Sequence, residues 1–413
     1  MILLGVEGGY EVSVIYLDFA KAFDKVDHEV LLSKLLALGI SGLLFDWICS
    51  FLLERRQIVL VDGRESEVEI PKSGVPQGSV LGPLLFLIHI SDIDINLQYA
   101  TASSFADDTR VMANENEASR ALIQGELAGI YDWAACNRME FNENKFEHIQ
   151  YRVQHNRKYD WTYLAANNQP ILKPQNVKDL GVTMDGEADF ELHISKMVSS
   201  ARRQAGWVLR TFRSRKRETM VTLYKSTVLP ILEYCSQLWN PNKLKMIRQI
   251  ESVQRYFTSR IIGLDNLTYW ERLKLLDMYS LERRERYMIL YLFKIILGIT
   301  PNFEDSRFKI KTVLNDRRGR SCIIPSISSS ASSRIKSLVD RSFPVRAPRL
   351  FNSLPKYLRT DYLNYEKFKV ALDKMLERVA DEPSLENMKP RAGSNSLIDQ
   401  LEQMKRDQTF QFV

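Results

Sequence analysis

The chain has 413 residues, of which 45% are hydrophobic and 10% aromatic, so it can bury a large core and should form at least two domains. Its net charge of +6 hides two unlike halves, because residues 1–150 hold 11 basic and 23 acidic residues whereas residues 151–413 hold 46 and 28. An acidic half that needs cations, joined to a basic half that attracts polyanions, favours a metal-dependent enzyme acting on nucleic acid.

Three classes of protein are disfavoured by composition. Cys49, Cys136, Cys235 and Cys322 lie far apart and without histidines at metal-binding spacing, which indicates a reducing compartment and argues against a zinc site. The N-terminus has no basic leader and no cleavage-like site, so we expect no signal peptide. The longest apolar run, residues 80–90, is broken by a Gly-Pro pair and is too short to span a bilayer, so no membrane partner is expected.

The first 153 residues alternate between strand-like and helix-like patterns. Asp27 and Ser79 stand where they can cap the helices that follow them. The order of elements predicts an α+β fold, an antiparallel sheet with helices on one face. In chain order we expect a strand at 12–17, helices at 27–38 and 41–53, a hairpin at 57–70, a helix at 79–90, a hairpin at 99–113, a helix at 117–139 and a strand at 145–153.

The rest of the chain is predicted to be mostly helical. The pattern weakens over 154–175, where we place a boundary, and a strand is expected at about 177–184. An Arg- and Ser-rich stretch at 315–340 has the composition of a flexible linker. Helices are expected at 201–212, 220–233, 245–262, 270–276, 281–297 and, in an otherwise polar tail, 396–406.

Asp107 and Asp108 form the most distinctive pair in the chain. Adjacent carboxylates repel each other and cost folding free energy unless a cation or strong hydrogen bonds compensate. By itself the pair reads as an ordinary solvated turn, since aspartate is a common turn residue. Two other stretches change that interpretation: the strand-like run that ends on the carboxylate of Asp18, and the glycine-containing loop 73–83, whose backbone can approach a ligand closely.

These three stretches in this order, LDFAKAFD at 17–24, SGVPQGSVLGP at 73–83 and FADD at 105–108, resemble the reverse transcriptase of LINE-type (non-LTR, jockey-like) retrotransposons. Residues 177–182, 193–197, 232–241 and 341–347 also look like the downstream part of such elements. A maturase of the group II intron type would share the catalytic stretches, but the segment 341–358 looks LINE-like and disfavours it.

The resemblance implies a division into a palm and a thumb. It predicts a partial palm domain at 1–190 and a helical thumb and connection region at 191–310. A flexible linker at 311–340 would follow, then a small C-terminal region at 341–380 and a mostly disordered tail at 381–413.

The resemblance also implies a catalytic site. Asp18, Asp107 and Asp108 would be the catalytic carboxylates that ligate Mg²⁺ or Mn²⁺, with Asp108 the least direct ligand. Phe19 and Phe23 would lie at the incoming nucleotide, and the bulky ring of Phe23 would exclude a 2′-hydroxyl and favour deoxynucleotides. The alternative for Phe23 is a plain core residue.

Other nucleotide contacts are implied by the same resemblance. Gln77 and Gly78 would line the nucleotide and the template, and Lys145 would lie near the phosphates as a general acid. A solvated surface lysine is an equally good interpretation of Lys145.

The basic helical half supplies candidates for contacts with nucleic acid. Its basic residues interleave with aromatic ones, which suits backbone contacts combined with stacking, although a solvated helix face would look the same. The partners implied are an RNA template, a DNA primer and deoxynucleoside triphosphates, which places the protein inside the cell, in the cytoplasm and nucleus. The candidate contact residues are Arg202, Arg203, Arg210 and Arg213.

Asp18 is preceded by only 17 residues, and the resemblance predicts fingers and an endonuclease upstream of it. Without the fingers, part of the grip on the triphosphate would be missing, so we expect an N-terminally truncated copy of a mobile element or a partial gene. Two functions follow: an RNA-directed DNA polymerase region, or a catalytically inactive nucleic-acid-binding remnant of such an element.

Overall fold

The computed structural model describes residues 2–152, 161–241, 243–300, 340, 342–360, 364–379, 381 and 396–406. The chain forms two compact units, one built from Met1–Val177 with Asp185–Ala188 and the other from Lys178–Met184 with Asp189–Val413. Among the described helices, none combines the length and the apolar character needed to cross a bilayer.

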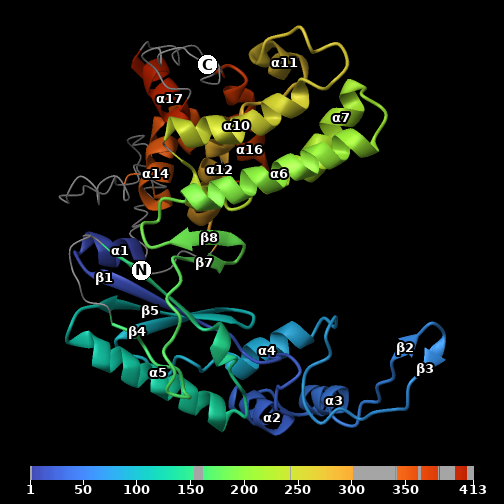
Figure 1. Cartoon of the computed structure of the whole chain (residues 1–413), viewed down its shortest axis with the longest axis vertical. Helices are drawn as coiled ribbons and strands as arrows, with labels where there is room; N and C mark the ends of the chain where they lie inside the picture. The colour runs from blue at the N-terminus through green and yellow to red at the C-terminus, as the bar shows by residue number, and fades with distance from the viewer. Residues whose placement is uncertain are drawn as a thin grey trace. The chain divides into compact units, whose positions relative to one another are not determined.

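The centre of the first unit is a four-stranded antiparallel sheet (Figure 1). Its strands are β1 (Glu11–Leu17), β4 (Ala100–Phe105), β5 (Asp108–Glu115) and β6 (Glu147–Tyr151), in the order β4-β5-β1-β6. Each neighbouring pair runs antiparallel. The predicted α+β fold with an antiparallel sheet is confirmed.

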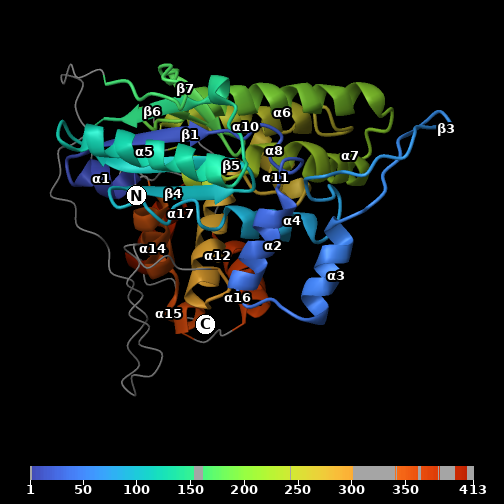
Figure 2. The same cartoon turned by 90° about the horizontal axis from the view of Figure 1, so that it is seen from below.

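Helix α5 (Ser119–Cys136) covers one face of this sheet (Figures 1 and 2). Ile15 and Leu17 of β1 share a buried core with Ile123 and Leu127 of α5. Because side chains alternate along a strand, the even-numbered residues of β1 point to the opposite face. Asp18 therefore belongs to the face that α5 leaves uncovered.

The opposite face meets a short helix that sequence patterns did not predict. Helix α1 (Ile2–Glu7) approaches β1 and β5 so closely that a Cβ added at Gly5 would overlap Val12 Cγ2 and Asn114 Oδ1. A glycine at this position is what permits the approach.

Three further helices continue the core of the first unit. They are α2 (His28–Ala37), α3 (Leu43–Leu52) and α4 (Gly82–Ile90). The predicted cap at Asp27 is confirmed, because its Oδ1 accepts a hydrogen bond from Val30 N at 3.0 Å. The cap predicted at Ser79 is wrong: the N-cap of α4 is Leu81, which forms no side-chain cap, and the Ser79 hydroxyl instead accepts a hydrogen bond from Gly82 N at 2.9 Å from the turn before the helix.

The predicted hairpin at 57–70 is present but has only a short ladder. Its strands β2 (Leu60–Val61) and β3 (Arg64–Glu65) flank Asp62 and Gly63, which both have positive φ, 49° and 77°. Figures 1 and 2 show this two-stranded arm extending away from α3 and α4.

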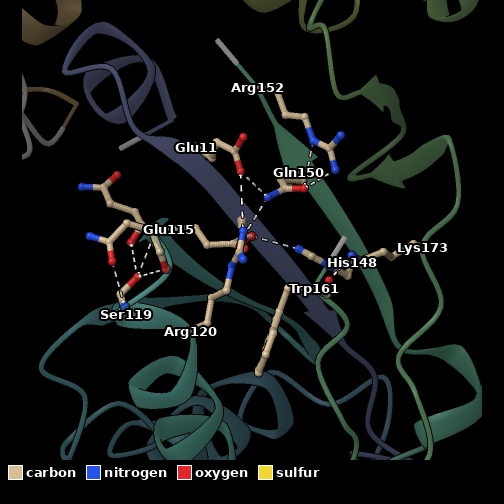
Figure 3. A network of polar contacts seen from close by, with 12 residues as sticks. Glu11, Glu115, Ser119, Arg120, His148, Gln150, Arg152, Trp161 and Lys173 are labelled. Carbon is tan, nitrogen blue, oxygen red and sulfur yellow. Dashed lines mark hydrogen bonds and ion pairs between the residues drawn. The ribbon is translucent and has the colours of Figure 1, made fainter. Parts of the chain in front are cut away.

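A polar cluster lies around the first residues of β1, at the end of the strand opposite to the one that Asp18 follows. Figure 3 shows this cluster. Arg120 Nε donates to Glu115 Oε1 at 2.6 Å, and the hydroxyl of Ser13 donates to the same carboxylate. His148 Nε2 lies 2.9 Å from Ser13 Oγ, and Gln150 Nε2 donates to Glu11 Oε2 at 2.8 Å. The cluster joins β1, β5, β6 and α5, so it fixes their register as well as satisfying buried charge.

The expectation of a single strand at 177–184 is wrong. The segment forms a hairpin of its own, β7 (Asn176–Asp179) and β8 (Val182–Asp185), outside the four-stranded sheet. Leu180 and Gly181 between them have φ of 43° and 86°. Two consecutive positive φ values make the tight turn that reverses a strand, so one continuous strand cannot form.

The second unit is helical, as predicted. Its longest helices, α6 (Glu191–Thr211) and α10 (Leu244–Thr258), lie side by side (Figure 1). The predicted helix at 220–233 is interrupted by a π-helical turn before Pro230, whose ring cannot fit the regular α-helical ladder. The other elements are α7 (Arg217–Leu223), the π-turn (Tyr224–Val228), α8 (Leu229–Glu233), α9 (Ser236–Trp239), α11 (Tyr269–Leu275), a 3₁₀ turn (Leu281–Arg284) and α12 (Glu285–Ile296).

The C-terminal helices pack on α12 around stacked aromatic rings. Phe293 and Phe368 have centroids 3.8 Å apart, and Phe351 and Leu397 belong to the same core. The predicted helix at 396–406 is confirmed, whereas the predicted linker at 311–340 lies outside the described residues except for residue 340. The helices are α14 (Phe343–Ser353), α15 (Lys356–Thr360), α16 (Tyr365–Leu376) and α17 (Leu397–Arg406).

Candidate active site

The ends of β1 and β5 bring two of the predicted catalytic carboxylates together. The β1–β5 ladder ends at Leu17 opposite Thr109, and Asp18 and Asp108 are the next residues, one on each strand. Residues at matching positions of an antiparallel pair project from the same face. Asp18 is partly buried and Asp108 is exposed, so both carboxylates are placed at the rim of the sheet.

Asp107 lies on the tight turn that joins β4 to β5. Phe105 pairs with Asp108, which leaves only Ala106 and Asp107 as the loop. Ala106 has φ of 52°, a left-handed conformation that costs a residue with a Cβ about 1–2 kcal/mol. Below the turn, the hydroxyls of Ser104 and Thr109 lie 2.9 Å apart. The hairpin therefore holds Asp107 at its tip in a strained, tightly connected backbone.

Lys145 brings a positive charge to Asp18. Its Nζ lies 3.0 Å from Asp18 Oδ2, across 127 residues of sequence. The lysine belongs to the 3₁₀ turn Glu143–Lys145, immediately before β6. Because β6 pairs with β1, the sheet itself brings the turn to the end of the strand that carries Asp18.

The donor chemistry of the three aspartates fits Mg²⁺ or Mn²⁺, which prefer carboxylate oxygens and retain several waters. Strand register brings Asp18 and Asp108 to the adjoining ends of β1 and β5, with Asp107 on the turn before Asp108. As placed, no three His, Cys, Asp or Glu side chains in the described part of the chain are close enough to hold a metal ion. The ligand assignment accordingly stays a prediction.

Comparison with known protein families matches residues 7–184 to the reverse transcriptase (RNA-dependent DNA polymerase) family. The chain is 29% identical over 260 residues to the RNA-directed DNA polymerase from mobile element jockey of Drosophila melanogaster, and 31% identical over 275 residues to its counterpart in Drosophila funebris. The chain carries a reverse transcriptase domain of the jockey-like, non-LTR type.

These matches cover 60% of the chain but only 28% and 29% of the two relatives. The chain therefore spans less than a third of the length of these relatives. Among solved structures, apo telomerase from Candida tropicalis aligns with 73% of this chain and 55% of its own, at 9% identity and a TM-score of 0.37, a likeness too loose to add to the sequence matches.

The two phenylalanines of the reverse transcriptase domain that were predicted at the nucleotide differ in environment. Phe19 is 4% exposed and stacks on Phe141 with centroids 4.5 Å apart, so its ring belongs to the core. Phe23 is half-buried and stacks on Phe86, also with centroids 4.5 Å apart. The stack fixes the Phe23 ring while leaving part of it open to a ligand.

The loop that contains Gln77 and Gly78 is tied to the segment that follows Asp18. Gln77 Nε2 donates to Asp24 Oδ1 at 2.9 Å, and Val75 N donates to Phe23 O at 2.9 Å. Gly78 has φ of 80° and open space around it. The structure thus joins two of the three recognised stretches into one surface, with Gln77 and Gly78 exposed on it.

Gly74→Ala is expected to separate these two stretches. Gly74 has φ of 85°, and a Cβ there would lie 2.7 Å from the backbone oxygen of Asp24. Strain and overlap together should lower the free energy of unfolding by about 2–4 kcal/mol. Gly78→Ala is the matched control, because it has a similar φ but no neighbour within 4 Å, and should cost only about 1 kcal/mol. Urea unfolding measures both, and equal losses would contradict the overlap.

Arg55 is a candidate that the sequence patterns missed. Its Nη2 donates to Ser73 O at 3.3 Å, and its Nε and Nη1 are buried with no hydrogen-bond partner among the described residues. Burial lowers its pKa, and the nearby carboxylate of Asp24 opposes that shift. A guanidinium beside the loop of Gln77 could bind a phosphate. The only sign of this group in the sequence is the Glu-Arg-Arg run before the hairpin.

The predicted nucleic-acid contacts lie in the second unit. Arg202, Arg203, Arg210 and Arg213 are all exposed, the first three on α6 and the last just after it. Arg202 Nη2 donates to Ser252 Oγ of α10 at 2.7 Å. Trp207 of α6 is 47% exposed, and Arg260, in the turn after α10, lies over the ring of Tyr256 at 4.9 Å, so aromatic and basic groups are interleaved on α6, on α10 and in the turn that follows α10.

Proposed function

We propose that this domain acts as an RNA-directed DNA polymerase that extends a DNA primer on an RNA template by two-metal nucleotidyl transfer. The observation that carries the proposal is the alignment of Asp18 with Asp108 at the ends of β1 and β5, with Asp107 on the adjoining turn. Membership of the reverse transcriptase family supports the reaction class.

Asp18, Asp107 and Asp108 would hold Mg²⁺ or Mn²⁺, Asp18 and Asp107 most directly. When bound, the ions activate the primer hydroxyl and neutralise charge on the transferred phosphate. The protein's part is positioning: the paired strands fix Asp18 and Asp108, and the two-residue turn fixes Asp107.

Nucleotide selection is assigned to the surface formed by Phe23 and the loop of Gln77 and Gly78. The Phe23 ring, held in place by Phe86, would pack under the sugar and exclude a 2′-hydroxyl. Gln77 and Gly78 would line the nucleotide and the template. Deoxynucleoside triphosphates are therefore the proposed substrates.

The exposed arginines of α6 would hold the template and primer by their phosphates, with Trp207 and Tyr256 available for stacking. Binding of this kind weakens as salt rises, because bound counter-ions are released from the nucleic acid. An RNA template and a DNA primer place the proposed activity in the cytoplasm and nucleus.

The experiment that tests this function is primer extension on an RNA template with all four deoxynucleoside triphosphates and Mg²⁺. Extension that stops when EDTA removes the metal would support the proposal. No extension, combined with RNA binding that weakens as salt rises, would favour the second candidate, an inactive nucleic-acid-binding remnant. The exposed basic and aromatic groups of α6 and α10 favour that candidate independently of catalysis.

A further inference from the structure

The loop before β6 is fastened to the end of β1. Asn142 N donates to Asp18 O at 2.7 Å, and Ala20 N donates to Glu140 O at 2.8 Å. Phe19 and Phe141 form a β-bridge between these two bonds, and their rings stack. Three successive residues on each side are therefore paired, which sets the loop at a defined distance from Asp18.

The backbone around Lys145 is held on both sides. Lys145 N donates to Asn142 O at 2.9 Å and closes the 3₁₀ turn. The next residue, Phe146, is fully buried and packs against Tyr131 and Phe141. Because the amide of Lys145 and the ring of Phe146 are both held, the Lys145 side chain starts from a fixed point, and its ammonium reaches Asp18 Oδ2 at 3.0 Å.

We propose that Lys145 is a built-in counter-ion that occupies Asp18 in the metal-free protein and that a divalent cation must displace. This inference rests on the proposed function, in which Asp18 is a metal ligand. It makes Lys145 a positioning residue whose charge sets the affinity of the site for metal.

Competition follows from simple electrostatics. An ammonium and a divalent cation need the lone pairs of the same carboxylate, and two cations at that range repel each other. The Lys145 side chain is 64% exposed, so its ammonium can leave Asp18 and become hydrated. It also contacts a single oxygen, without the bidentate grip that an arginine could add.

The arrangement gives Lys145 two positions with different uses. Against Asp18, it neutralises a carboxylate that would otherwise repel Asp108 across the strand pair. Released from Asp18, it remains at the edge of the site, where a triphosphate would offer it new oxygens. The charge near Asp18 is thereby balanced both before and after metal binding.

The test is a Mn²⁺ titration of the whole chain, with free Mn²⁺ followed by electron paramagnetic resonance. Lys145→Met is expected to bind Mn²⁺ about three- to fivefold more tightly than the parent, the upper part of the range expected for removing one largely exposed competing charge. Lys145→Arg keeps the charge and should stay within about twofold of the parent or bind more weakly, since a guanidinium competes at least as well.

Lys25→Met is the matched control. Lys25 forms an ion pair with Glu140, in the loop that also carries Lys145, and within the described part of the chain it forms no ion pair with Asp18. This variant also removes one positive charge nearby, so it measures the long-range effect of charge alone. Mn²⁺ affinity within about twofold of the parent is expected.

Asp18→Asn separates the possible failures. If it abolishes the strongest Mn²⁺ binding while Lys145→Met leaves the affinity unchanged or weaker, the counter-ion role is overturned and the metal site stands. If Asp18→Asn leaves binding unchanged, Asp18 is no metal ligand, and both the ligand assignment and the counter-ion role are overturned. Tighter binding in Lys25→Met equal to that in Lys145→Met would also overturn a direct role for Lys145.

Discussion

Asp107→Asn is expected to abolish primer extension while leaving RNA binding within a few-fold of the parent protein. The substitution keeps the size and shape of the side chain but removes the charge at the tip of the β4–β5 turn. Losing a group that stabilises charge at the reacting phosphate should lower the rate by at least roughly 10²–10³-fold.

RNA binding should survive because it depends on other residues. The phosphate backbone is attracted by cations, and the exposed arginines assigned to that role lie on α6 and just after it, in the second unit. Removing one negative charge from the first unit cannot weaken that attraction. Binding is measured by fluorescence anisotropy with labelled RNA at two or more salt concentrations.

Asp46→Asn provides the matched control for Asp107→Asn. Asp46 is an exposed aspartate in the first turn of α3, outside the three recognised stretches. Its substitution should leave extension within about twofold, as is usual for exposed surface positions. If Asp107→Asn lost extension and RNA binding equally, the residue would be structural and the catalytic assignment would fail.

Periodicity and local motifs predicted the elements that carry the site. The apolar run before Asp18 forms β1, and the residues around Asp107 form a hairpin, as predicted. Both predictions succeeded because each depends on a pattern of consecutive residues. The cap at Asp27 was predictable for the same reason. The hairpin at 176–185 was missed because Leu180 gives no sign in sequence that it adopts positive φ.

Contacts between distant residues could not be read from sequence. The pairing of Lys145 with Asp18 depends on β6 lying beside β1, which no local pattern specifies. The buried cluster of Figure 3 is a second example, since Glu115, Arg120 and His148 would each be placed on a surface by their chemistry. Their burial is tolerated because hydrogen bonds within the cluster pair their polar groups. These hydrogen bonds form only when the sheet is assembled.

Glu251→Gln is expected to remove a large pH dependence from the stability of the helical unit. Glu251 lies on α10 and is 2% exposed. Its carboxylate accepts a hydrogen bond from Leu281 N at 2.9 Å and is also bonded to the hydroxyl of Tyr269. Burial raises the pKa of Glu251 to about 8, although the bond from Tyr269 acts to lower it.

The sign of the effect follows from proton linkage. In the unfolded chain this carboxyl would titrate near its ordinary pKa of 4.5, so between pH 4.5 and 8 the folded protein binds the extra proton. Its contribution to stability is therefore complete below pH 4.5 and is lost as the pH rises through 8. The loss should approach roughly 3 kcal/mol between pH 4.5 and 7, at about 1.4 kcal/mol for each pH unit.

Urea unfolding between pH 4.5 and 8.5 gives the free energy of unfolding of the parent and of Glu251→Gln. The difference between the two proteins at each pH is the contribution of Glu251. Other buried groups titrate as well, such as Glu233 and His193, but they are present in both proteins and cancel. Glu218→Gln, at an exposed position of α7, should keep the slope of the parent. Because the side chain at position 251 is neutral in the variant, the stability of Glu251→Gln relative to the parent should rise steadily with pH. Parallel curves would show that Glu251 is ionised in the folded protein and that its hydrogen bonds outweigh its burial.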